Sequence, residues 1–243
     1  MHQGIYKVVS NTSIADKTWR LTLSGDTTSI ARGGQFVDIA LDGHFLRRPL
    51  AVLEWDESGL SVIYKVVGKG TEELSAVRPG AGLDLLVGLG NGFDASKCRE
   101  SALVVAGSIG ASPTFSLVKE LIALGRKVKV VLGFNSEKDV ILADEYRALG
   151  AETTVVTLDG SLGTKGLVTD AMPDGGYDFF YTCGPKPMMK AVCEKALTSG
   201  EASLEERMGC GCGICYGCTC HTTGGARRVC ADGPVFEKET IIW

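Results

Sequence analysis

The sequence has no long apolar run and no concentration of charge of one sign, and these absences exclude several classes of protein. No stretch approaches the roughly 18 apolar residues that cross a bilayer, and the start, MHQGIYKVVS, lacks the charged-then-apolar pattern of a secretory signal. The net charge is only -4, with both signs mixed along the chain, so no basic surface for nucleic acid is predicted. We therefore expect a cytosolic protein with neither a membrane nor a nucleic acid as its partner.

Cysteine is almost missing from most of the chain. The first 182 residues contain only Cys98, whereas six of the nine cysteines lie between Cys210 and Cys230. A disulfide framework would spread its cysteines more widely, so this clustering indicates metal binding.

The 243 residues suffice for two ordinary domains and a small third unit. Short alternating apolar runs, separated by turn residues, predict an antiparallel β-barrel or sandwich in the first part. These runs begin at residues 6, 18, 34, 50, 60 and 83. The barrel is assigned to residues 1–94.

From Ser101 the pattern changes to a continuous apolar run, ALVVAG, followed by helical spacing, and this unit repeats. The alternation predicts an α/β domain with a doubly wound parallel sheet, assigned to residues 95–200. Helices are expected at 112–124, 139–149, 166–171 and 187–198, and further strands at 127–132, 152–157 and 177–182. After Gly200 the periodicity disappears, so a small metal-stabilised domain is assigned to residues 201–243.

Four cysteines have the spacing of a plant-type [2Fe-2S] site. Cys210, Cys215 and Cys218 form C-x4-C-x2-C, and Cys230 follows after eleven residues. Glycines in the tight loop allow sharp turns and leave amide groups free to face the sulfurs. The spacing predicts these four residues as the metal ligands.

Other metal sites fit the same residues less well. A structural zinc site could use Cys215 and Cys218 as one half, but the second C-x2-C of zinc ribbons is missing. A Rieske centre needs two imidazoles, and only His221 lies nearby. Cys212 and Cys220 have no place among the four ligands, although spacing alone permits Cys212 to replace Cys210.

Two turns of the predicted parallel sheet are candidate nucleotide sites. Gly107-Ser-Ile109-Gly110 ends the first parallel strand where a helix begins, and Cys183-Gly184-Pro185 ends the fourth in the same way. A pyrophosphate can lie against the amides of such a turn. Each turn alone could be merely structural, but two turns at one sheet edge favour a nucleotide crevice.

The barrel region offers two further phosphate-binding candidates. Arg47-Arg48-Pro49-Leu50-Ala51 joins two strands, and Gly68-Lys-Gly70-Thr71 follows another at the start of a short helix. An arginine supplies a bidentate donor and a helix start supplies amides. Taken alone, each could equally be a surface turn.

In this order the motifs resemble the ferredoxin reductase superfamily, and the cluster after the nucleotide domain is similar to the electron transfer subunits of type B dihydroorotate dehydrogenase. The most specific segments frame the cluster: Glu206-Arg207-Met208-x-Cys210 and Cys230-x-Asp232-Gly233-Pro234-Val235-Phe236. The resemblance covers essentially the whole chain.

The resemblance implies FAD and nicotinamide contacts by position. FAD would be held by Arg48, Pro49, Leu50, Ala51, Ile63, Tyr64, Lys65, Gly70 and Thr71, and NAD by Gly107, Ile109, Gly110, Cys183, Gly184 and Pro185. Two residues depart from the family: Ala51 replaces a usual Ser or Thr, and Ser108 a usual glycine. Cys183 would lie near the nicotinamide, or be a small buried strand-end residue.

The resemblance also implies a function in pyrimidine biosynthesis. An FMN-containing catalytic subunit would oxidise dihydroorotate, and electrons would pass through the [2Fe-2S] cluster and FAD to NAD, in an assembly with two copies of each subunit. The same module could instead serve a ferredoxin–NADP oxidoreductase, a sulfide complex or a hydrogenase complex. A zinc-stabilised binding protein without redox chemistry is the alternative from another class.

After the second parallel strand, Gly133 to Glu137 contains no arginine and ends in an acid, which favours NAD over NADP.

Overall fold

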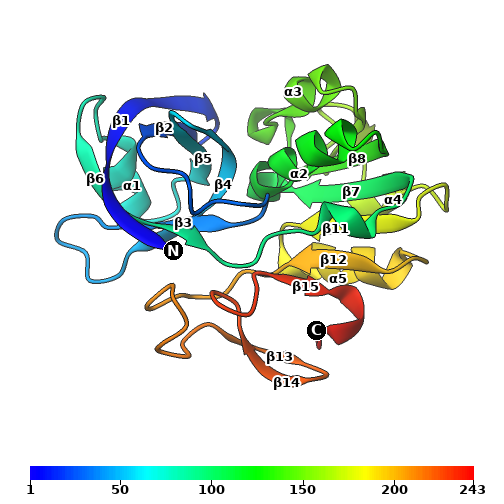
Figure 1. Ribbon diagram of the computed structural model, residues 1–243. Coiled ribbons are helices and arrows are strands. Elements are labelled where there is room, and N and C mark those ends of the chain that lie inside the picture. The colour runs from blue at the N-terminus through cyan, green and yellow to red at the C-terminus, as the bar shows by residue number, and fades with distance from the viewer.

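The computed structural model describes residues 1–243, and its first part is a closed antiparallel barrel with strand order β1-β2-β5-β4-β3-β6 (Figure 1). Its strands are β1 (His2–Ala15), β2 (Thr18–Ser24), β3 (Phe36–Ile39), β4 (Arg48–Asp56), β5 (Gly59–Lys65) and β6 (Gly82–Leu89). On β6 the inward residues Leu83, Leu85, Val87 and Leu89 alternate with partly exposed ones, as expected for a strand with one buried face. The predicted β-barrel is confirmed. Helix α1 (Lys69–Ser75) follows β5.

The second part is a seven-stranded sheet with order β10-β9-β8-β7-β11-β12-β15. Its strands are β7 (Ser101–Gly107), β8 (Lys127–Phe134), β9 (Glu152–Thr157), β10 (Thr164–Lys165), β11 (Phe179–Cys183), β12 (Gly200–Ser203) and β15 (Val235–Glu237). All neighbouring pairs are parallel except β12 and β15. The helices are α2 (Ala111–Ala123), α3 (Ala143–Ala148), α4 (Val168–Ala171) and α5 (Lys186–Lys195), and no helix is long and apolar enough to cross a membrane.

Both faces of the central strand β7 are covered by helices. Val104 packs in the cluster that contains α2, whereas Leu103 and Val105 pack in the one that contains α5. Figure 1 shows α2 and α3 on one side of the sheet and α4 and α5 on the other. The continuous apolar run therefore predicted a strand buried on both faces correctly, and the doubly wound architecture is confirmed.

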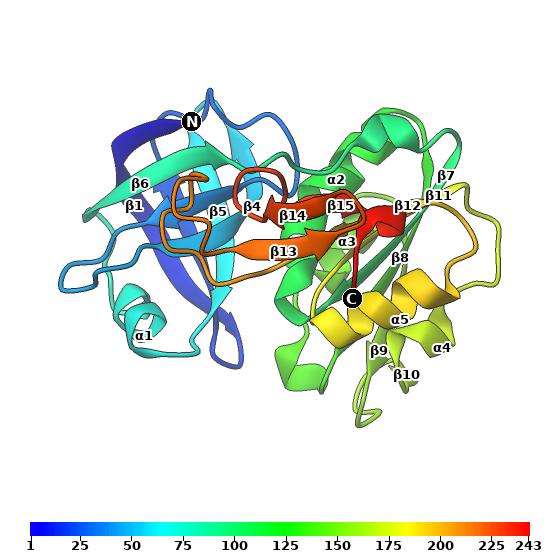
Figure 2. The same cartoon turned by 90° about the horizontal axis from the view of Figure 1, so that it is seen from below.

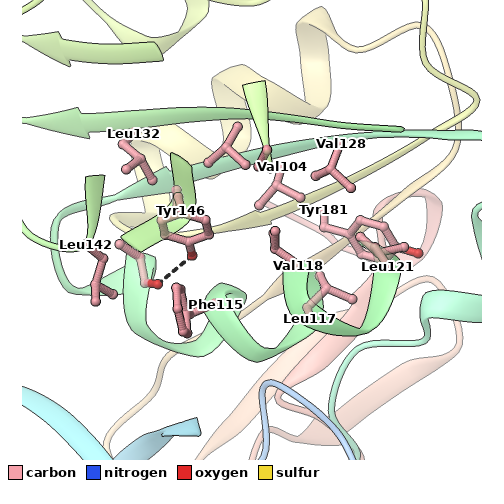
Figure 3. Packing of buried hydrophobic residues seen from close by; sticks show 14 of the residues in the cluster. Val104, Phe115, Leu117, Val118, Leu121, Val128, Leu132, Leu142, Tyr146 and Tyr181 are labelled. Atoms are coloured by element: carbon pink, nitrogen blue, oxygen red, sulfur yellow. Dashed lines mark hydrogen bonds between the residues drawn. The ribbon is translucent and has the colours of Figure 1, made fainter. Parts of the chain in front are cut away.

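Helix α2 packs against both the barrel and the sheet, and this packing fixes the turn before it, Ser108–Gly110. Phe115 meets the Tyr146 ring edge to face, with 5.1 Å between centroids (Figure 3). The Tyr146 hydroxyl lies 2.7 Å from the carbonyl oxygen of Ala111, in the first turn of α2. The same apolar cluster includes Leu53 and Ile63 of the barrel. This packing places the start of α2 firmly at the end of β7.

Two expectations about secondary structure need correction. The helix expected at 139–149 is reduced to α3, because Leu142 has a left-handed backbone (φ 61°) that no α-helix continues. The segment after Gly200 also supplies strands β12 and β15 to the nucleotide sheet, where no strand was expected. The remaining hairpin, β13 (Thr219–Thr222) and β14 (Gly225–Arg228), forms a separate two-stranded sheet.

Candidate cofactor sites

The cysteine-rich segment lies across the barrel and the nucleotide sheet (Figures 1 and 2). Asn91, just after the barrel, fixes it there: its amide nitrogen donates to the Val235 carbonyl at 2.8 Å, and its side-chain oxygen accepts from the Val235 amide at 3.1 Å. The Asn91 backbone amide also donates to the Gly233 carbonyl at 2.8 Å. Sequence reasoning missed Asn91, because a single asparagine in a linker carries no pattern.

Cys218 and Cys230 form one pair. Hairpin β13–β14 returns the chain so that the Val229 amide donates to the Cys218 carbonyl at 3.0 Å and the Cys230 amide approaches Cys218 Sγ at 3.4 Å. Burial and the neighbouring Cys218 raise the pKa of the Cys230 thiol to about 12. Both side chains are buried, and a bound cation would have to supply the charge that keeps them as thiolates.

Cys210 and Cys215 form a second pair in the preceding loop. The Cys210 sulfur accepts the amides of Ile214 at 3.2 Å and of Cys215 at 3.4 Å. Burial raises the pKa of Cys210, but these bonds and the Cys212 amide outweigh it and lower the pKa to about 6. Cys210 is therefore prepared as a thiolate, the form that binds metal.

The two pairs favour a two-iron cluster over a single zinc ion. The loop with the first pair lies against the segment with the second, since a Cβ on Gly213 would lie 2.8 Å from the Ala231 side chain. A [2Fe-2S] cluster takes four thiolates, two on each iron, whereas zinc needs all four ligands around one point. The donor set fits the cluster.

The two additional cysteines differ from the predicted ligands. Burial raises the pKa of Cys212, and its hydrogen bond to Cys210 raises it further, so Cys212 keeps its proton where Cys210 loses it. Cys220 points into the apolar cluster behind the hairpin, and burial raises its pKa as well. The two backbone amides that Cys210 Sγ accepts favour Cys210 over Cys212 as the ligand.

Asp38 lies between the cysteine loop and the strand with the predicted flavin motif. On β3 it is paired with Pro49 of β4, and its carboxyl contacts the loop at Gly211, where an added Cβ would lie 2.5 Å from Oδ2. The residue is 2% exposed, and Oδ1 has no hydrogen-bond partner. Burial raises its pKa to about 6, against the opposing effect of Arg47. An acid inside the apolar run GQFVDIAL was the signal that sequence reasoning left unused.

The Asp38 pKa predicts a pH-dependent cost to stability. Because the pKa is higher in the folded chain than its ordinary value, the folded state holds this proton more tightly, and stability is lost as the pH rises from about 4 to about 6. We expect Asp38→Asn to increase the free energy of unfolding by about 1–3 kcal/mol near neutral pH. Urea unfolding at about pH 5 should show roughly half that gain. An equal gain at both pH values would contradict the assignment.

The structure brings two of the predicted FAD motifs into contact. The Arg48 side chain lies directly against Gly70 at the start of α1, in the space that a Cβ at position 70 would occupy. Arg48 also contacts His44 Nδ1 at 2.6 Å. A fixed guanidinium beside a helix start is suited to a diphosphate.

The other predicted FAD residues differ in their burial and in the partners of their side chains. Pro49, Leu50 and Ala51 are half-buried at the start of β4, beside Ile63 on the neighbouring β5. Three side chains are engaged elsewhere. The Tyr64 hydroxyl bonds to Asn11 at 3.0 Å, Lys65 Nζ bonds to Asp139 at 2.8 Å, and the Thr71 hydroxyl accepts the amides of Val67 and Gly68. Lys65 thereby ties the barrel to the nucleotide domain.

A matched pair of glycines tests the Arg48 site. Gly70→Ala should displace the guanidinium and weaken FAD binding about tenfold or more, because a hydrogen bond to a charged group contributes about 1.5–3 kcal/mol. Gly175→Ala is the control, since position 175 lies outside the FAD motifs and a Cβ there meets nothing within 4 Å. Fluorescence titration of the flavin-free protein with FAD measures both. Equal affinities for the two variants would remove Arg48 from the site.

The two predicted nucleotide turns pack against each other. In the sheet, Cys183 is paired with Ala106, next to Gly107. A Cβ on Gly110 would overlap the Cys183 carbonyl, and one on Gly107 would lie 3.0 Å from Pro185. A cavity of about 130 Å³ adjoins the second turn, lined by Gly184, Pro185, Lys186, Met189, Leu204, Glu205 and Glu206. The prediction that both turns meet at one sheet edge agrees with this geometry.

Three side chains shape this edge. Ser108 has a left-handed backbone (φ 52°), the conformation that the glycine usual in the family would adopt without strain. Ser112, in the first turn of α2, is 1% exposed and its hydroxyl has no partner. Burial raises the pKa of Cys183 to about 12, so Cys183 is a protonated thiol and not a nucleophile. Ile109 is half-buried between these residues.

Comparison with known proteins gives two family matches. Residues 205–242 match the iron-sulfur cluster binding domain of dihydroorotate dehydrogenase B, and residues 104–194 match the oxidoreductase NAD-binding domain. The first range contains all four predicted ligands, and the second contains both nucleotide turns.

Full-length relatives are similar throughout. The electron transfer subunit of dihydroorotate dehydrogenase B (NAD(+)) from Bacillus pumilus is 40% identical, over 99% of this chain and 98% of its own. The corresponding subunit from Bacillus caldolyticus is 42% identical, over 97% and 96%. Among solved structures, a chain of the NADH-dependent reduced ferredoxin-NADP oxidoreductase superposes with a TM-score of 0.90 at 31% identity, over 99% of this chain and 90% of that chain. Phthalate dioxygenase reductase, at 18% identity and a TM-score of 0.66 over 79% and 64%, shares the fold.

Proposed function

Because the chain belongs to the family of dihydroorotate dehydrogenase B electron transfer subunits, we propose that it carries electrons from a dihydroorotate-oxidising catalytic subunit to NAD+. Its cofactors are FAD and a [2Fe-2S] cluster, with NAD as co-substrate. The two cysteine pairs are the observation that supports the proposal most directly. The loop with the first pair contacts Asp38 on β3 of the barrel, and β3 pairs with β4, the strand that begins at Arg48. The reaction is an oxidation in pyrimidine biosynthesis.

The chain's residues bind and orient these groups. When bound, FAD exchanges single electrons with an iron-sulfur cluster and a hydride with nicotinamide, so it couples the two. Cys210, Cys215, Cys218 and Cys230 would hold the cluster, and Arg48 with Gly70 would hold the FAD diphosphate. The turns at Gly107–Gly110 and Cys183–Pro185 would hold NAD at the end of β7 and β11. No side chain has to move a proton for hydride transfer.

The catalytic partner is proposed to carry FMN and to assemble with this chain as two copies of each subunit, in the cytosol. The relatives' name supports an electron transfer role beside a catalytic subunit. Sedimentation of the mixed subunits, together with flavin analysis, tests the composition. Equal amounts of FMN and FAD in an assembly of four chains would agree with it.

A coupled assay tests the function. The purified chain, mixed with the FMN-containing catalytic subunit, should support dihydroorotate-dependent reduction of NAD+, followed at the absorbance of NADH. Neither subunit alone should do so. If the mixture oxidises dihydroorotate with dyes but never reduces NAD+, the proposed function is wrong.

A second candidate is the corresponding subunit of a reduced ferredoxin–NADP oxidoreductase. The 31% identity over 99% of the chain supports it. Relative rates with dihydroorotate and with reduced ferredoxin as donor separate the two candidates. The acid and the lack of arginine between Gly133 and Glu137 favour NADH over NADPH as the coenzyme in either case.

A further inference from the structure

Arg228, at the end of hairpin β13–β14, connects the loop with three predicted ligands to the segment with the fourth. Its guanidinium binds Asp232 through two contacts, Nε to Oδ2 at 3.0 Å and Nη2 to Oδ1 at 3.1 Å. A third contact, from Nη1, reaches the Gly213 carbonyl at 2.8 Å. Asp232 follows Cys230 by two residues, and Gly213 lies between Cys210 and Cys215. One side chain thus joins both ligand segments.

The Gly213 carbonyl belongs to the same peptide unit as the Ile214 amide. That amide donates to Cys210 Sγ at 3.2 Å. In a planar trans peptide the carbonyl and the amide point in opposite directions, so an arginine that fixes the carbonyl also aims the amide. A donor on the carbonyl polarises the peptide as well and strengthens the bond to sulfur.

The loop is built for this close approach. Gly213 has a left-handed backbone (φ 87°), and a Cβ there would lie 2.8 Å from the Ala231 side chain, beside Cys230. Tyr216 also has a left-handed backbone (φ 57°), and the Arg228 guanidinium lies 5.0 Å from its ring centroid. Arg228 therefore holds the loop on both sides of Cys215.

We propose that Arg228 is a positioning residue that raises the reduction potential of the cluster by aiming the Gly213–Ile214 peptide at the Cys210 sulfur. The inference rests on the proposed function, because it concerns the cluster assigned there. Hydrogen bonds to cluster sulfurs stabilise the added negative charge of the reduced state. Loss of the arginine therefore disfavours reduction.

Potentiometric titration followed by electron paramagnetic resonance tests the proposal. In Arg228→Gln the equilibrium constant for one-electron reduction should fall about tenfold, which corresponds to about 59 mV. Arg228→Lys keeps the charge but lacks the planar fork, so it should show more than half of this fall. The matched control is Arg227→Gln, which removes the same charge from the neighbouring residue; the Arg227 backbone pairs with Cys220, its side chain bonds neither Asp232 nor Gly213, and the constant should shift much less. Rates of NADH-to-dye transfer should be unchanged in all three.

Asp232→Asn separates positioning from simple charge. Removing a negative charge near the cluster would by itself ease reduction, whereas releasing Arg228 from its carboxylate should disfavour it. We expect the equilibrium constant to fall. An Asp232→Asn variant that reduces more easily, or equal shifts in the Gln variants at 227 and 228, would overturn the positioning role.

Iron and sulfide analysis distinguishes a failure of the Arg228 role from a failure of the proposed function. A wild-type chain without iron and sulfide would refute the cluster and the proposed function together. A wild-type chain with a cluster whose potential is unchanged in Arg228→Gln would refute only the role of Arg228. If Arg228→Gln fails to retain a cluster, Arg228→Lys and Asp232→Asn still decide the question.

Discussion

Replacing Cys218 with serine is expected to abolish electron transfer between the catalytic subunit and NAD+. Cys218 is 1% exposed, and its sulfur accepts the Cys230 amide at 3.4 Å. A serine hydroxyl stays protonated at neutral pH and is a much poorer iron ligand than a thiolate. The coupled rate should fall by more than the roughly 10–100-fold that loss of an outer-shell partner costs. The dihydroorotate-to-NAD+ assay measures it.

Two readouts accompany that variant. NADH-to-dye transfer through FAD should persist, because the barrel and the nucleotide turns are untouched. Cys220→Ala is the matched control: Cys220 lies two residues away, is buried, and belongs to neither pair, so iron and sulfide content should stay normal. A Cys218→Ser protein with the same coupled rate as Cys220→Ala would contradict the ligand assignment.

Replacing Gly110 with alanine should weaken NADH binding strongly. The added Cβ would overlap the Cys183 carbonyl and lie 2.8 Å from the Gly184 amide, so the two nucleotide turns must separate. Overpacking of this kind costs about 1–3 kcal/mol. If moving the two turns apart distorts the NAD site, this corresponds to roughly 10–100-fold in affinity for NADH. The KM for NADH in dye reduction should rise accordingly.

A distant glycine controls for general loss of stability. Gly175→Ala adds a Cβ that meets nothing within 4 Å and should leave both the KM and the melting temperature unchanged. In Gly110→Ala the melting temperature should fall by several degrees at most, while FAD remains bound. An unchanged KM for NADH would exclude the two turns as the NAD site.

Features that repeat along the chain were predictable. The alternation of Leu83, Leu85 and Val87 marks a strand with one buried face, and the unbroken run from Ala102 to Ala106 marks one with two. Cysteine spacing is equally informative, because ligand geometry restricts it. These local patterns established the barrel, the parallel sheet and the cluster segment.

Features decided by tertiary contacts were not predictable. Leu142 lies inside the predicted helix, yet it is buried with Ile141 in the core in a left-handed conformation, and α3 begins only after it. Strands β12 and β15 have only four and three residues, too few for a period to show. Asp38 contacts Gly211, which is distant in the sequence. The role proposed for Arg228 depends on the orientation of one peptide, Gly213–Ile214. Single residues with such roles carry no periodic signal.

One anaerobic titration tests most directly the prediction that the four cysteines hold a cluster that receives electrons from NADH through FAD. Stepwise addition of NADH to the purified chain should bleach the flavin absorbance and produce the paramagnetic signal of a reduced [2Fe-2S] cluster, and Cys218→Ser should bleach without that signal. A wild-type chain whose flavin bleaches while no cluster signal develops, or which contains no iron and sulfide, would contradict the account.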